Sequence, residues 1–242
     1  MFVDVHSHVV PSRDDGVSSL AEGLELCREA ARRGTSVLFA TPHVSPQLPL
    51  TAEREEEIRR AHAEMVPQAA EHGLDLRLGF ELTPAPELLE EDLTRYLLGD
   101  LAAVLVELPF AGPLDLAERV AEEIEGAGLM PVIAHPERAE RVIERPELMD
   151  AFAERGWILQ VNATSLLGDH GLGPEATGWR FVERGLAGLV ASDGHRATRP
   201  PFLDQARAAA RRRVGERADE LFDGRALASL ALRGRADLAE RS

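Results

Sequence analysis

Several features are scarce or missing in this sequence, and each one excludes a class of protein. The 242 residues include one cysteine, Cys27, which rules out an intrachain disulfide. No apolar run reaches the roughly 18 residues that a membrane span requires. The first residues, Met1–His8, have no basic stretch followed by an apolar one, so we expect no signal peptide. Together these absences predict a cytoplasmic protein that does not insert into membranes.

Basic residues are outnumbered, and no segment resembles a linker. Lysine and arginine total 27 against 42 acidic residues, which gives a net charge of -15. Such a surface repels phosphate backbones and therefore disfavours nucleic-acid binding. An acidic surface explains most of this charge, although carboxylates that hold divalent cations could account for part of it. Without a composition shift to divide the chain, we predict a single domain over residues 1–242.

Short apolar runs alternate with longer helical patterns along the chain. The runs are rich in Val, Leu and Ile and nearly continuous, which is typical of strands buried on both faces. The expected strands are Phe2–His6, Val37–Ala40, Leu76–Phe80, Ala103–Glu107, Pro131–Ala134, Trp157–Val161 and Gly188–Ser192.

Amphipathic helices are expected between these strands. The clearest is Ser19–Arg33, where Ser19 and Glu22 fit a capping box and Gly34 ends the helix. The others are Thr51–His72, Pro86–Leu98, Asp115–Ala127, Arg138–Arg155, Pro174–Arg184, Pro201–Arg213 and Arg217–Leu232. Alternation at this spacing predicts an α/β fold with a parallel sheet. Seven strands favour a distorted TIM-like (β/α)7 barrel, and a doubly wound open sheet remains possible from periodicity alone.

Histidines and carboxylates recur where the expected strands end. In a parallel barrel these carboxyl ends meet on one face, where such folds place their active sites. The residues concerned are His6, His8, His43, Glu81, Glu107, His135, Asp193 and His195, with Asp14 and Asp15 in a nearby loop. Imidazole and carboxylate suit zinc, manganese or iron. The set is too large for one ion and sufficient for two or three, which could clamp a phosphoryl group and generate hydroxide near neutral pH.

Other reactive residues have simpler explanations. His62 and His72 lie in a charged helix, where solvated or structural roles are expected, and the role of His170 in a flexible loop stays open. Cys27 and Arg33 satisfy the Cys-x5-Arg pattern of thiol-based tyrosine phosphatases. However, Cys27 falls in mid-helix, far from the phosphate-cradling helix N-terminus which that chemistry requires.

The motifs around these residues resemble the polymerase-and-histidinol-phosphatase (PHP) superfamily. The closest similarity is to the manganese-dependent protein-tyrosine phosphatases of bacterial capsule and exopolysaccharide operons. The matching segments are Asp4-Val5-His6-Ser7-His8, Asp14-Asp15-Gly16, Ala40-Thr41-Pro42-His43, Gly79-Phe80-Glu81, Val106-Glu107-Leu108-Pro109-Phe110, Ala134-His135-Pro136-Glu137-Arg138, Asn162 to Gly168, Ala191-Ser192-Asp193-Gly194-His195 and Arg199-Pro200-Pro201.

The resemblance implies the PHP fold, a distorted seven-stranded barrel, and three divalent metal ions, most simply manganese, with iron, zinc or magnesium as alternatives. It assigns His6, His8, Glu81 and Asp193 to one ion. It assigns Glu81, Glu107 and His135 to a second, and Asp15, His43 and His195 to a third. Arg138 and Arg199 match phosphate-binding arginines, whose planar guanidinium suits a phosphoryl dianion. The implied substrate is a phosphotyrosyl protein, such as the tail of a bacterial tyrosine kinase of polysaccharide biosynthesis.

In the implied mechanism a hydroxide that bridges two metals attacks phosphorus, and His43 or His195 assists as general acid. Three departures from the family pattern concern the surroundings of the ligands. The loop 44–50 replaces a histidine-bearing aromatic loop and should border the substrate. Phe80 replaces a polar residue, and Gly194 replaces a larger one.

Other functions remain as alternatives. The same chemistry could act on histidinol phosphate or another small phosphomonoester. A nucleic-acid-processing enzyme of the superfamily is disfavoured by the net charge. A non-catalytic metal-binding regulatory module would not need every ligand position. The sequence does not predict the oligomeric state.

Overall fold

The strands of this protein form two parallel sheets. The computed structural model describes residues 1–231. The sheets have the orders β1-β2-β4 and β3-β5-β6-β7-β8-β9. The strands are β1 (Phe2–Asp4), β2 (Thr35–Ala40), β3 (His43–Val44), β4 (Asp75–Leu78), β5 (Glu81–Leu82), β6 (Ala103–Glu107), β7 (Met130–Ala134), β8 (Ile158–Asn162) and β9 (Ala187–Ala191). Neighbouring strands follow in chain order without the reversal that a doubly wound sheet requires.

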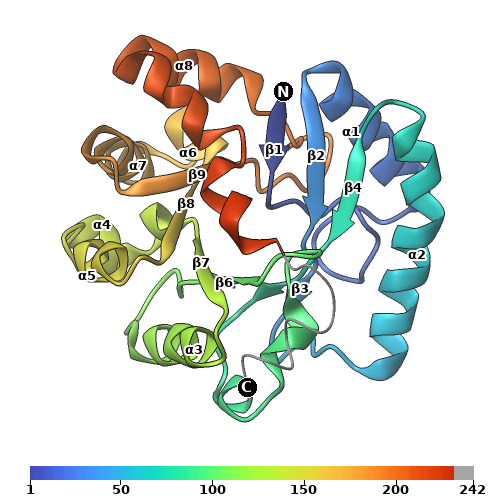
Figure 1. The fold of residues 1–242 in the computed structure, drawn as a ribbon, viewed down its shortest axis with the longest axis horizontal. Coiled ribbons are helices and arrows are strands. Elements are labelled where there is room, and N and C mark those ends of the chain that lie inside the picture. Colours follow the sequence, from blue (N-terminus) through green and yellow to red (C-terminus); the bar gives the residue numbers. More distant parts are fainter. Residues whose placement is uncertain (232–242) are drawn as a thin grey trace.

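The two sheets continue into each other at both junctions. The N–H of Gly79 donates to the carbonyl of Ala40 at 2.8 Å, so β2–β3 and β4–β5 act as two interrupted strands. On the other side, the N–H of Asp193 donates to His6 at 2.9 Å, and the N–H of His8 donates to Gly194 at 2.6 Å. Seven strand positions therefore follow one another, and the labelled strands in Figure 1 are arranged around the middle of the molecule. The predicted α/β fold with parallel strands is confirmed.

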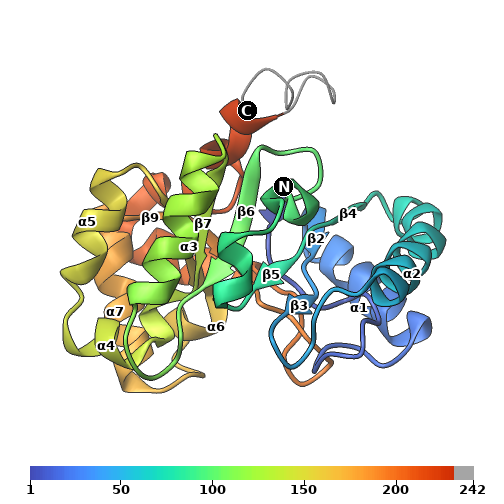
Figure 2. The same cartoon turned by 90° about the horizontal axis from the view of Figure 1, so that it is seen from below.

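Helices cover the outside of the strands. The α-helices are α1 (Leu20–Arg32), α2 (Ala52–Ala70), α3 (Asp115–Gly126), α4 (Glu140–Glu144), α5 (Leu148–Glu154), α6 (Ala163–Leu166), α7 (Leu172–Arg184) and α8 (Asp204–Val214). Seen from below, α1 and α2 lie on one side of the strands, and α3, α4, α5 and α7 lie on the other (Figure 2). None of the helices within residues 1–231 combines the length and apolar character of a membrane span.

Helix α1 shows how local sequence defines an element. The hydroxyl of Ser19 accepts a hydrogen bond from the N–H of Glu22 at 3.2 Å, as the predicted cap requires. The Glu22 carboxylate instead accepts from the N–H of Ser18 at 2.9 Å, so the capping box is only half formed. The buried face of the helix includes Leu26 and Cys27.

Three predicted helices are wrong in form. The segment 86–98 contains two 3-10 turns, η1 (Pro86–Leu89) and η2 (Leu93–Tyr96), because Asp92 caps a new turn. The segment 138–155 starts at the end of η3 (Pro136–Arg138) and is then divided at Pro146: α4 ends before this proline, which cannot continue a helix, and α5 begins after it. The segment from 217 onward forms 3-10 turns, η4 (Gly215–Leu221) and η5 (Arg225–Leu230), and the predicted end at Leu232 lies outside the described residues.

The strands themselves are buried, as the apolar runs predict. Every residue of β6 and β8 is buried, including the polar Glu107, Gln160 and Asn162. The first strand ends at Asp4 rather than at His6, because the chain there turns from pairing with β2 to contact the segment after β9. This break brings the following histidines beneath the ends of several strands.

Candidate metal centre

Nine histidines and carboxylates predicted as metal ligands lie close together at the carboxyl ends of the strands. Their donor atoms fall into three overlapping groups. The groups are His6, His8 and Glu81; Glu81, Glu107 and His135; and His8, Asp15, His43 and His195. Asp193 adjoins the first group, with its Oδ1 3.4 Å from Nε2 of His6 and 3.6 Å from Nε2 of His8.

The backbone is specially shaped where two of these residues follow their strands. His135 after β7 has a φ of 33°, and Asp193 after β9 has a φ of 52°. Both angles lie in the left-handed region, which costs energy for residues other than glycine. The turns direct both side chains into the cluster, where Nε2 of His135 lies 2.9 Å from Oε1 of Glu81 and Oδ1 of Asp193 lies 3.4 Å from Nε2 of His6.

The spacing of the donor atoms fits the first shell of a metal ion. Nε2 of His6 lies 3.3 Å from Nε2 of His8 and 3.1 Å from Oε2 of Glu81. Donor atoms bound about 2.0–2.2 Å from one ion lie roughly 3.0–3.5 Å apart by simple geometry. Oε2 of Glu81 and Nε2 of His195 are buried and form no well-aligned hydrogen bond among the described residues, although other donor atoms of the cluster lie about 3.1 Å from each. A cation between these atoms would satisfy them, so the residues fit a metal cluster.

The third group differs in one respect from the set implied by resemblance. Oδ1 of Asp15 lies 3.1 Å from Nε2 of His195 and 3.5 Å from Nε2 of His43, as expected. His8 lies within the same group, and its ring stacks on that of His195 with centroids 3.9 Å apart. The geometry therefore allows His8 to face either of two ion positions.

Residues outside the ligand set orient the histidines. Nδ1 of His6 lies 2.9 Å from Oε1 of Gln160, and Nδ1 of His8 lies 3.2 Å from Oδ2 of Asp14. Each contact fixes which ring nitrogen faces the centre. Gln160 also donates to Asn162 at 2.8 Å, and Asn162 donates to Oδ2 of Asp193 at 2.8 Å.

The carboxylates set the protonation of the metal-free centre. Burial lowers the pKa of His6, but the charges of Glu81 and Asp193 raise it to a net value of about 9. Burial likewise opposes protonation of His43, and Glu81 and Asp15 raise its pKa to about 11. For Asp14, burial raises the pKa, but the contact with His8 holds it well below its usual range. Without metal, protons on the imidazoles therefore compensate the buried negative charge.

Two arginines and one phenylalanine lie at the edge of this cluster. Nη1 of Arg138 donates to Oδ2 of Asp193 at 2.9 Å. Nη2 of Arg199 lies against Nδ1 of His195 and 3.8 Å from Oδ1 of Asp193. The ring of Phe110, 49% exposed, stacks on His135 with centroids 5.7 Å apart, and the Arg138 guanidinium lies 4.7 Å above it.

The remaining histidines lie outside the groups. His62 is half-buried with its Nε2 3.0 Å from the carbonyl of Leu76, and His72 is exposed. These positions agree with the structural or solvated roles predicted for them. Nδ1 of His170 lies 2.9 Å from the hydroxyl of Ser165. Burial and, to a smaller extent, the charge of Arg138 lower the pKa of His170 to about 4.

Three residues that support the ligands, Gln160, Asn162 and Glu137, were not predicted from the sequence in this role. Besides Gln160 and Asn162, the carboxylate of Glu137 joins two strand ends, accepting from the N–H of Asn162 at 2.9 Å and the hydroxyl of Ser165 at 2.7 Å. One available signal was the pair of polar residues inside the otherwise apolar run 157–162. A buried strand rarely includes such residues without a hydrogen-bonding role.

Known proteins are similar to this chain in both sequence and fold. The sequence model of the family "Capsular polysaccharide synthesis, CpsB/CapC" matches residues 2–226. Tyrosine-protein phosphatase YwqE of Bacillus subtilis is 32% identical over 212 residues, covering 84% of this chain and 81% of that protein. Putative tyrosine-protein phosphatase CapC of Staphylococcus aureus is 27% identical over 203 residues, covering 83% and 80%.

A solved structure agrees with these relatives. It matches with a TM-score of 0.79 and 30% identity over 89% of both chains. It is one of the crystal structures of YwqE from Bacillus subtilis and CpsB from Streptococcus pneumoniae, described as unique metal-dependent tyrosine phosphatases. The lactonase Lmo2620 from Listeria monocytogenes, with a TM-score of 0.51 and 13% identity, shares the fold alone. With a match over nearly all of its described length, this chain belongs to the CpsB/CapC family of capsular polysaccharide synthesis proteins.

Proposed function

We propose that this protein is a metal-dependent protein-tyrosine phosphatase, which hydrolyses a phosphomonoester of tyrosine. The observation that carries the proposal is the convergence of nine imidazoles and carboxylates, with the Arg138 guanidinium at their edge. The relatives named as tyrosine phosphatases support the same reaction.

We infer three divalent ions in the centre, with manganese as the first candidate and iron, zinc and magnesium as alternatives. His6, His8, Glu81 and Asp193 would hold one ion. Glu81, Glu107 and His135 would hold a second, and Asp15, His43 and His195 a third, with His8 close to both the first and the third. When bound, such ions polarise phosphoryl oxygens and lower the pKa of a water molecule toward neutrality.

In this proposal, Arg138 and Arg199 bind the phosphoryl group. Arg138 donates a hydrogen bond to Asp193, whereas Arg199 lies 3.8 Å from the same carboxylate with its Nη2 against His195. A phosphoryl dianion would compete for those donors, since a guanidinium binds phosphate oxygens in a planar fork. If one of these two histidines is not bound to metal and acts as general acid, His43 is the better placed, because its side chain is 26% exposed whereas that of His195 is 6% exposed.

Phe110 favours an aryl substrate over an alkyl one. Its ring is 49% exposed and lies against both His135 and the Arg138 guanidinium, so its exposed part can pack on a phenyl phosphate held at the centre. In the variant Phe110→Ala, we expect KM for p-nitrophenyl phosphate to rise several-fold while KM for an alkyl phosphate changes little. Equal changes for both substrates would contradict this role.

We further propose a tyrosine kinase of polysaccharide biosynthesis as the protein substrate, and the cytoplasm as the location. The decisive experiment measures metal content and turnover together. Purified protein is analysed for bound metals and assayed with phosphotyrosyl peptide, histidinol phosphate and an aryl phosphate, before and after chelation. Chelator-sensitive turnover with preference for the peptide supports the proposal, preference for histidinol phosphate redirects it, and metal binding without turnover of any substrate overturns it.

A further inference from the structure

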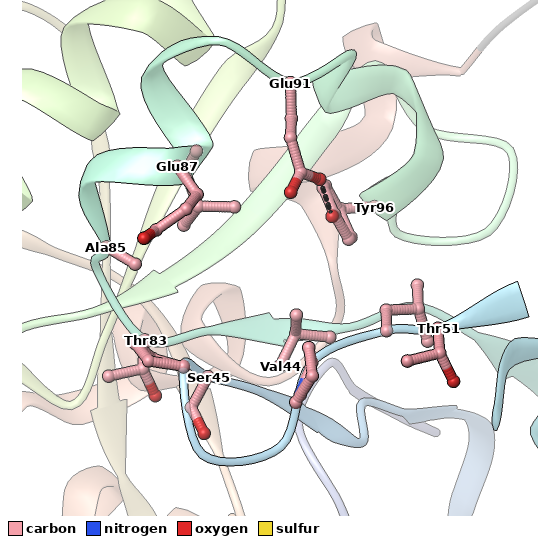
Figure 3. Close-up of a pocket in the computed structure, with 12 residues that line it drawn as sticks. Val44, Ser45, Thr51, Thr83, Ala85, Glu87, Glu91 and Tyr96 are labelled. Carbon is pink, nitrogen blue, oxygen red and sulfur yellow. Dashed lines mark hydrogen bonds between the residues drawn. The ribbon is translucent and has the colours of Figure 1, made fainter.

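A cavity lies beside the metal centre. Its volume is about 290 Å³, near the lower end of the roughly 300–1,000 Å³ usual for ligand pockets. The loop after β3 and the segment from Thr83 to Tyr96 form its walls, as Figure 3 shows. The loop after β3 is the segment 44–50 that departs from the family pattern.

Two residues connect this cavity to the centre. The hydroxyl of Thr83, which lines the cavity, donates to Oε1 of Glu107 at 2.5 Å. Val44, another lining residue, directly follows His43 in β3. The cavity therefore begins one residue away from two proposed ligands, within reach of a peptide whose phosphotyrosine occupies the centre.

The lining is apolar and its rim is acidic. Val44, Leu50 and Leu88 are buried side chains that face the cavity. Glu87 and Glu91 are exposed lining residues, and in Figure 3 their side chains project from the segment above the loop. Glu91 accepts a hydrogen bond from Tyr96 and lies 3.7 Å from Arg95. Glu87 forms no ion pair within residues 1–231, so its charge is available to a partner.

We propose that this cavity is a specificity subsite for the phosphotyrosyl protein. It takes one apolar side chain near the phosphotyrosine, and Glu87 attracts an adjacent lysine or arginine of the same peptide. The inference rests on the proposed phosphatase function. The volume of the cavity suits a single side chain. The apolar lining excludes a charged side chain, because an unpaired buried charge is costly, and the acidic rim complements a basic neighbour in the peptide.

A peptide series tests the subsite directly. The host peptide contains phosphotyrosine flanked by glycines, and leucine or glutamate replaces one flanking glycine at a time, up to three positions away on either side. At one position we expect leucine to raise kcat/KM by roughly tenfold over glycine, since burying such a side chain is strongly favourable. Lysine next to that leucine should add a gain of about twofold to fivefold at low salt, and this gain should shrink at high salt.

Variants locate the effect in the cavity. Glu87→Lys should abolish the gain from lysine, whereas Glu90→Lys, an exposed glutamate of the same segment outside the cavity, should preserve it. Ala85→Leu adds a side chain to the cavity wall and should remove the preference for leucine. If Ala85→Leu does not fold, the pair of charge variants still decides the question.

The outcomes separate this inference from the proposed function. If all peptides are hydrolysed with equal kcat/KM, or if Glu90→Lys acts like Glu87→Lys, the subsite is wrong while the phosphatase proposal stands. If no phosphotyrosyl peptide is hydrolysed by the metal-loaded protein, the proposed function itself fails.

Discussion

Asp193 is held by several neighbours at once. It receives hydrogen bonds from Asn162 and Arg138, and its other oxygen faces His6. The surrounding positive charges outweigh burial, which would otherwise raise its pKa, and keep this carboxyl ionised with a pKa below its usual range. At the scale of single residues, His6, His8 and Asp193 are each held in position by a partner outside the proposed ligand set.

Removing Arg138 tests the proposed phosphate clamp. In Arg138→Ala we expect kcat/KM toward p-nitrophenyl phosphate to fall by about 10²–10³, the loss typical of a donor that stabilises developing charge. Arg138→Lys should recover part of this loss, because it keeps the charge but not the fork. Steady-state kinetics with metal content measured in parallel checks this, and wild-type efficiency in Arg138→Ala would disprove the clamp.

Cys27 should not contribute to catalysis. It lies in the middle of α1, it is 1% exposed, and burial raises the pKa of its thiol to about 12. A thiol of this kind is not a nucleophile near neutral pH. We expect Cys27→Ser to retain full phosphatase activity once corrected for folded protein, and a loss of several orders of magnitude would instead support a thiol mechanism.

Among the elements, the segment after β9 shows why a departure from the family pattern is tolerated here. Gly194 lies between two proposed ligands, and its backbone pairs with Ser7. A Cβ at this position would lie 2.6 Å from Cα of Pro201. In this chain, the close packing of the Arg-Pro-Pro segment on this turn leaves no room for a Cβ at position 194.

Substitution of this glycine should disturb both packing and metal binding. We expect Gly194→Ala to lower the free energy of unfolding by about 1–3 kcal/mol, as overpacking typically does, and to weaken metal affinity because Asp193 and His195 move with the backbone. Gly126→Ala is the matched control, since no atom lies within 4 Å of its added Cβ. Denaturant unfolding and metal titration of both variants check this, and equal behaviour would contradict the packing argument.

Across the whole molecule, the net charge of -15 and the buried carboxylates lead us to expect that bound cations stabilise the fold. Saturating metal at 100 times its Kd would stabilise the fold by about 2.7 kcal/mol. We therefore expect chelation to lower Tm and abolish activity, and readdition of manganese to restore both. An unchanged Tm after complete metal removal, verified by elemental analysis, would argue against this linkage.

Because protons and metal ions compete for the same imidazoles, metal affinity should depend on pH. Without metal, the pKa of His6 is raised from 6.5 to about 9, so its proton stabilises the metal-free fold below pH 6.5, and this contribution is lost as pH rises through 9. Metal binding must displace that proton, so apparent affinity should increase from pH 7 to about pH 9. Calorimetric titrations in buffers of different ionisation enthalpy would measure the released protons, and binding without proton release would contradict the prediction.

The sequence by itself determined the strand–helix order, the parallel arrangement and the placement of reactive residues at strand ends, because periodicity and apolar runs follow directly from which faces are buried. It also predicted the donor set of the proposed centre. Only the tertiary structure decided that Gln160, Asn162 and Glu137 support this set and that a cavity adjoins Glu107, and it also showed that the segment 86–98 turns into 3-10 helix. The supporting contacts and the cavity depend on residues far apart in the chain, whereas the 3-10 turns follow from the local cap at Asp92, which hydrophobic periodicity does not detect.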